Sequence, residues 1–186
     1  ARMIAQDAST LARSLGPVES IMATGSVLPA VRVLIALGAV EDAGLILPNT
    51  PPGQADSSHG VDDPIGGLLA LKSRIVIERN PTVAVALARG VLDRPGATLV
   101  WARARHLMDA AHTLIRAKDQ RAKEAVSLAL ASVDGTQFKL LQMEAGFLAG
   151  RVGLGGEALS RANKILDSLD HELGSPEGFR ARWTKE

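Results

Sequence analysis

The sequence has no cysteine and very few aromatic residues. The absence of cysteine excludes disulfide frameworks, thiolate metal sites and cysteine nucleophiles, and it is typical of a cytoplasmic protein. The chain has 3 Phe, 2 Trp and no Tyr, whereas a β-sandwich would use more rings in its core. The core must therefore be built from Ala, Leu, Val and Ile, a composition that suits closely packed helices.

The chain also has no long uninterrupted apolar run. Its longest apolar stretch, residues 27–47, is broken by Pro29, Arg32, Gly38, Glu41 and Asp42, so we predict no membrane span. The first residues do not have the basic and then apolar pattern of a secretory signal, and the missing initiator Met suggests a fragment of a longer protein. With 46% hydrophobic and 22% charged residues, we expect residues 1–186 to form a single domain.

Charge is unevenly distributed along the chain, although the net charge is only +1. Residues 1–67 carry 3 basic and 7 acidic side chains, and residues 68–186 carry 18 and 13. The densest basic stretch offers candidate nucleic-acid contacts at Arg94, Arg105, Arg116, Lys118, Arg121 and Lys123. We favour a solvated helix surface, because no aromatic stacking platform accompanies the charge.

Glycine and proline divide the rest of the sequence into segments of helical length. Residues 48–67 are rich in Pro and Gly and are predicted to form a long loop. Near the end of this loop, Asp63 and Pro64 are predicted to be a helix N-cap and the first residue of the helix that follows. A short helix is expected within a tail at 174–186, after Ser175 and Pro176. The other predicted helices are Ile4–Leu15, Leu68–Arg79, Thr82–Leu92, Thr98–Ala117, Arg121–Val133, Gln137–Gly150 with Thr136 as cap, and Glu157–Leu173.

An α/β alternative has to be weighed at two places. Residues 74–78 and 82–86 are rich in β-branched side chains and could be strands. Each lies in an apolar segment longer than a typical strand and has no hairpin turn chemistry beside it. We therefore predict an all-α fold.

The predicted turns recur along the chain. They lie near Gly38, Asn80, Asp119 and Leu154, at intervals of 42, 39 and 35 residues, which is typical of stacked helical hairpins. Alanine follows shortly after each turn. Small side chains are needed where the two helices of a hairpin cross closely.

The segments Ala36–Ala43, Leu68–Leu92 and Gly155–Ala158 resemble the tetratricopeptide-like repeats of large LuxR-family bacterial transcriptional regulators of the maltose-activator type. The resemblance covers about Val27 to Leu173. It implies antiparallel hairpins stacked as a right-handed solenoid, interrupted by the 48–67 loop, and a sensor region that responds to an effector.

Candidate catalytic chemistry is sparse. His106, Asp109 and His112 could offer ligands to zinc, but the two histidines are six residues apart and point to different sides of a helix. We expect these three residues to be polar groups on an exposed or groove-lining face. The glycine-rich residues 150–156 follow a predicted helix, so they are interpreted as a turn and not a phosphate loop. Trp101 is expected to be a core or groove anchor, and Trp183 lies in the tail.

These observations predict a non-enzymatic interaction or sensor module without a cofactor or metal. The first helix of each hairpin usually faces the concave side, so the predicted groove residues are Arg32, Lys72, Arg103, His106 and Lys139. The expected partner is a protein, a peptide or a small effector. We expect no binding to a membrane. The alternatives are nucleic-acid binding through residues 94–123, a metal-dependent helical enzyme, and a homo-oligomeric assembly subunit.

Overall fold

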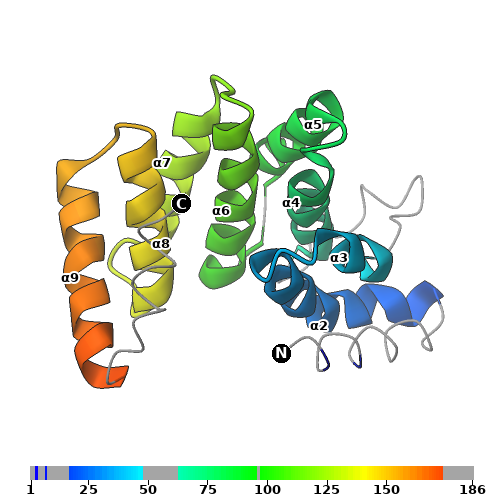
Figure 1. The fold of residues 1–186 in the computed structure, drawn as a ribbon, viewed down its shortest axis with the longest axis horizontal. Coiled ribbons are helices and arrows are strands. Elements are labelled where there is room, and N and C mark those ends of the chain that lie inside the picture. The colour runs from blue at the N-terminus through cyan, green and yellow to red at the C-terminus, as the bar shows by residue number, and fades with distance from the viewer. Residues whose placement is uncertain (1–2, 4–6, 8–16, 48–62, 96, 174–186) are drawn as a thin grey trace.

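The computed structural model describes residues 3, 7, 17–47, 63–95 and 97–173, and the regular elements within these ranges are all helices (Figure 1). The all-α prediction is therefore confirmed, and the strand alternative for residues 74–78 and 82–86 is wrong. Within the described ranges, no helix is long and apolar enough to cross a membrane. The helices are α2 (Pro17–Ala36), α3 (Val40–Ile46), α4 (Pro64–Val76), α5 (Pro81–Asp93), α6 (Val100–Arg116), α7 (Ala122–Val133), α8 (Lys139–Arg151) and α9 (Gly156–Leu173).

Consecutive helices pack in pairs: α2 with α3, α4 with α5, α6 with α7, and α8 with α9. The pairs also pack against one another in chain order. The first helices α2, α4, α6 and α8 contact each other in succession, and α5 and α7 contact the first helix of the next pair. Figure 1 shows this order running from the blue end of the molecule to the orange end.

Side-chain caps fix the start of the second pair. The Asp63 carboxylate accepts a hydrogen bond of 3.1 Å from the Gly66 backbone N–H, and Pro64 is the first helical residue of α4. Asn80 caps α5 in the same way, accepting from the Val83 N–H at 3.1 Å. The predicted cap at Asp63 is confirmed, so the expectation that the loop reaches residue 67 is wrong; residues 48–62 lie outside the described residues.

Turns with left-handed backbone separate the helices of three pairs. Gly38 has a φ of 74°, Lys118 a φ of 54° and Gly153 a φ of 69°, and each follows a helix closely, where such a residue ends the helical hydrogen-bonding pattern. The turns predicted near residues 38, 80, 119 and 154 are confirmed. The predicted helix Ile4–Leu15 and the tail with Ser175, Pro176 and Trp183 fall outside the described residues, apart from Asp7, which is helical.

The predicted start of the helix at Gln137–Gly150, with Thr136 as its cap, is wrong. Thr136 donates its hydroxyl to the Val133 carbonyl at 2.7 Å and thus closes the end of α7. Its oxygen accepts only a long 3.4 Å hydrogen bond from the Phe138 N–H, and α8 begins at Lys139. The hydroxyl thus has a partner on each side, and its bond to the end of α7 is the shorter one.

Alanine fills much of the interior, as the scarcity of rings predicts. The largest cluster of buried apolar residues joins α4 to α8, and fully buried alanines in it include Ala70, Ala88, Ala104, Ala110, Ala111, Ala125, Ala129, Ala145 and Ala149. The helices α8 and α9 approach each other closely at Gly146. A Cβ placed on Gly146 would lie 2.6 Å from the Ala158 carbonyl oxygen and 2.7 Å from the Ala162 Cβ. At this crossing, small residues allow the two backbones to meet.

Candidate ligand-binding groove

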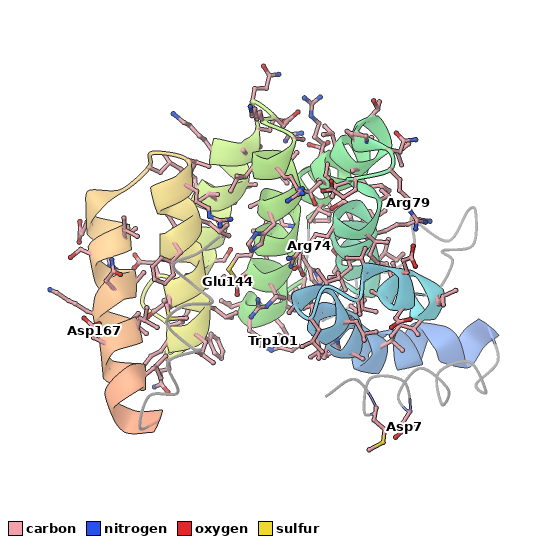
Figure 2. The ribbon with its side chains drawn as sticks, in the orientation of Figure 1. Asp7, Arg74, Arg79, Trp101, Glu144 and Asp167 are labelled. Atoms are coloured by element: carbon pink, nitrogen blue, oxygen red, sulfur yellow. The ribbon has the colours of Figure 1, made fainter. Side chains whose placement is uncertain are left out.

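The first helices of the pairs border two adjoining hollows. One, of about 720 Å³, is lined by residues of α2, α4, α6 and α8, and the other, of about 740 Å³, lies next to it. Both are lined by Ile35, Arg74 and His112, so we treat them as one groove. Figure 2 shows Arg74, Trp101 and Glu144 on α4, α6 and α8, the helices that border it.

A buried carboxylate joins three of these helices. Asp109 in α6 is 1% exposed, and it accepts a hydrogen bond of 2.7 Å from Arg32 Nε of α2 and one of 3.0 Å from Arg74 Nη1 of α4. Burial alone would raise the pKa of Asp109, but the positive charges of Arg32, Arg74 and Arg105 outweigh it and hold that pKa well below its usual range. Asp109 is therefore ionised at neutral pH and is a poor proton acceptor.

A second buried carboxylate joins α6 to α8. Glu144 is 7% exposed and accepts a short hydrogen bond from Arg105 Nη1, while His112 Nε2 lies 3.5 Å from its Oε1. Burial would raise the pKa of Glu144, but the hydrogen bond from His112 and the charge of Arg105 lower it. The two carboxylates thus alternate with arginines across the groove and link α2, α4, α6 and α8.

The three residues considered as zinc ligands do not come together. His106 is 3% exposed and packs against the start of α4, where a Cβ on Gly67 would lie 2.8 Å from His106 Nε2. The oxygens of Asp109 are taken by arginines, and His112 faces Glu144. Among the described residues, no group of three or more histidines and carboxylates could hold a metal ion. Of the expected exposed or groove-lining positions, Asp109 and His112 line the groove, and the arginine partners of Asp109 let it be buried there. His106 does neither, because it is buried against the start of α4.

The five predicted groove residues lie in different surroundings. Arg32 lines the groove. Arg103 points toward α5 and donates to the Val91 carbonyl at 3.1 Å, and His106 is buried beside α4. Lys72 is half-buried on α4 and Lys139 is exposed at the start of α8, and neither lines the two hollows. Trp101, expected to be an anchor, lines the groove and is 46% exposed.

Sequence reasoning missed Arg74 and Glu144 and gave Arg105 a different role. The signal was available: each is a charged residue within an apolar helical segment, on the face that packs against neighbouring helices. A charge in such a position is seldom buried without a partner. One sequence does not say which residue that partner is.

The basic stretch at 94–123 is broken up by carboxylates. Its contacts pair Arg94 with Asp63, Arg105 with Glu144, Arg116 with Glu78, and Arg121 with Asp93 and Glu124. Lys118 and Lys123 are exposed. These four arginines thus have acidic neighbours from α5, α7 and α8, from the residue before α4 and from the turn after it.

In comparisons with known proteins, no family model matches the sequence, and no curated protein or solved structure matches the chain.

Proposed function

We propose that this chain is a non-enzymatic, tetratricopeptide-like helical-repeat module, stacked as a right-handed solenoid, that binds a protein, peptide or small effector in its groove. The observation that carries the proposal is that one helix of every pair, α2, α4, α6 and α8, contributes residues to the groove. In stacked repeats, such a shared concave face is where ligands bind. The buried carboxylates support a binding role, because they serve to hold arginines in place.

The resemblance to large bacterial LuxR-family regulators supports a place in transcriptional or signalling control. In such a protein, the ligand would act by favouring one arrangement of the repeats over another, and neighbouring domains would respond. The groove is suited to this, since Asp109 and Glu144 connect helices of all four pairs.

The test is selection from a random short-peptide library, followed by binding measurements on Trp101→Ala. Trp101 is 46% exposed, so its truncation leaves the fold intact, and it lines the groove. We expect the variant to weaken binding of the selected peptides about tenfold or more, as loss of an aromatic anchor does. Fluorescence anisotropy gives the affinities, and circular dichroism checks the fold.

The matched control is Val83→Ala on α5. Val83 is exposed to a similar extent, 44%, but does not line the groove. It should leave the affinity unchanged. If no peptide is selected, peptide binding is excluded as the function. If both variants bind the selected peptides as the wild type does, the groove is not the binding site.

A further inference from the structure

Positive charge dominates the groove lining. The two hollows are lined by three carboxylates, Asp109, Glu144 and Glu78, and by five arginines, Arg32, Arg74, Arg105, Arg116 and Arg151. A concave surface with low-dielectric walls concentrates the field of such an excess. The groove therefore attracts anionic groups.

The carboxylates of the groove are more deeply buried than its arginines, and this strengthens the attraction for anionic groups. Asp109 and Glu144 are 1% and 7% exposed, whereas Arg32, Arg74 and Arg105 are 18%, 24% and 27% exposed. A ligand in the groove thus meets guanidinium groups and not the carboxylates beneath them. A guanidinium has five N–H donors, and Asp109 receives one hydrogen bond from Arg74. Donors that the buried carboxylates do not use can serve a ligand.

Apolar side chains border the same groove. Trp101, Leu37 and Val33 line it and are 46%, 55% and 38% exposed. A ligand that fits must combine carboxylates with an apolar group. The two adjoining hollows, of about 720 and 740 Å³, suit an extended segment better than a small anion.

We propose that the groove binds an acidic peptide segment, whose carboxylates pair with Arg74, Arg105 and Arg151 and whose apolar side chain packs on Trp101. This inference rests on the proposed function and names the class of partner. A peptide is favoured over a nucleic acid because a single Trp among aliphatic side chains is no platform for successive bases.

The first test uses the peptides selected from the random library. The enriched sequences should carry net negative charge. Replacing their Glu and Asp with Gln and Asn should weaken binding about tenfold or more, and raising the salt concentration should weaken the acidic peptides alone. If the selected peptides depend on Trp101 but are uncharged or basic, the groove still binds peptides and the acidic preference is overturned. If no binding depends on Trp101, the proposed function itself fails.

The second test reverses one charge at the edge of the groove. Arg151 is exposed and lines the groove, so Arg151→Glu should weaken acidic peptides several-fold without unfolding the chain. Lys123→Glu makes the same charge change at an exposed position on α7 outside the lining, and it should have little effect. Equal losses in the two variants would overturn the proposal. Tighter binding of a generic oligonucleotide, weakened by Lys123→Glu, would assign the charge to nucleic acid instead.

Discussion

Asp109 shows how much a single residue can hold in place. It lies among apolar side chains of α6, yet it is ionised because Arg32 and Arg74 reach it from two other helices. A buried ion pair of this kind adds little to the free energy of unfolding compared with apolar side chains in place of all its members. Removing only one member, however, leaves the charges of its partners buried and uncompensated.

We therefore predict that Asp109→Ala lowers the free energy of unfolding by about 3 to 5 kcal/mol. Glu41→Ala is the control, since it removes the carboxylate from an ion pair with Arg79 whose side chains are 83% and 76% exposed. That change should cost less than about 1 kcal/mol. Urea unfolding followed by circular dichroism measures both. Similar midpoints for the two variants would contradict a structural role for Asp109.

His106 gives the stability a dependence on pH. Burial lowers the pKa of His106 to about 4, with Arg32 and Arg103 acting in the same direction and Asp109 and Asp63 opposing them. The unfolded chain therefore takes up a proton near pH 6.5 that the folded chain refuses until about pH 4. We predict that the free energy of unfolding falls as pH drops through this window, by at most about 3 kcal/mol.

The check is urea unfolding at several pH values between about 4 and 7 for wild type and His106→Gln. The variant cannot titrate at this position, so its stability should vary less with pH, whatever its absolute value. Parallel pH profiles would show that His106 is not the group responsible.

At the scale of the helix, the distance between neighbouring backbones decides which glycines can be replaced by alanine without loss of stability. Gly146 lies where α8 meets α9, and an added Cβ would press on the Ala158 carbonyl oxygen at 2.6 Å. Gly90 in α5 has only the Leu69 side chain nearby, at 4.0 Å. The same substitution should thus have opposite effects in two helices.

We predict that Gly146→Ala destabilises the chain by about 1 to 3 kcal/mol through overpacking. Gly90→Ala should stabilise it by about 0.5 to 1 kcal/mol, because alanine has the higher helix propensity. Thermal unfolding of the two variants compares them directly. A stabilised Gly146→Ala would mean that α8 and α9 can separate without loss.

The sequence predicts helices better than it predicts their ends. The Asp63 and Pro64 signal marked the start of α4 correctly, because a cap and a proline act through local geometry alone. The prediction that Thr136 caps the helix after it was wrong, because its hydroxyl has two possible partners, the end of α7 and the start of α8. Only the fold decides between such local alternatives.

For the whole molecule, the groove could be predicted only in outline. The regular spacing of the turns and the scarcity of aromatic residues predicted helices packed in pairs. Both features are consequences of how helices pack against each other. The ion pairs between the buried carboxylates and the arginines of the groove could not be predicted from the sequence. Arg32 and Asp109 are 77 residues apart, and Arg74 and Asp109 are 35 apart. Local patterns do not reveal which distant charges neutralise each other.

The 77-residue separation of Arg32 and Asp109 also sets a delay during synthesis. At about 5 to 20 residues per second, Arg32 is made roughly 4 to 15 s before the aspartate that neutralises it. For that time α2 has a charged side chain beside Val31 and Leu34, which become fully buried in the finished protein. Until α6 is synthesised, Arg32 therefore lacks the carboxylate that neutralises it in the folded protein.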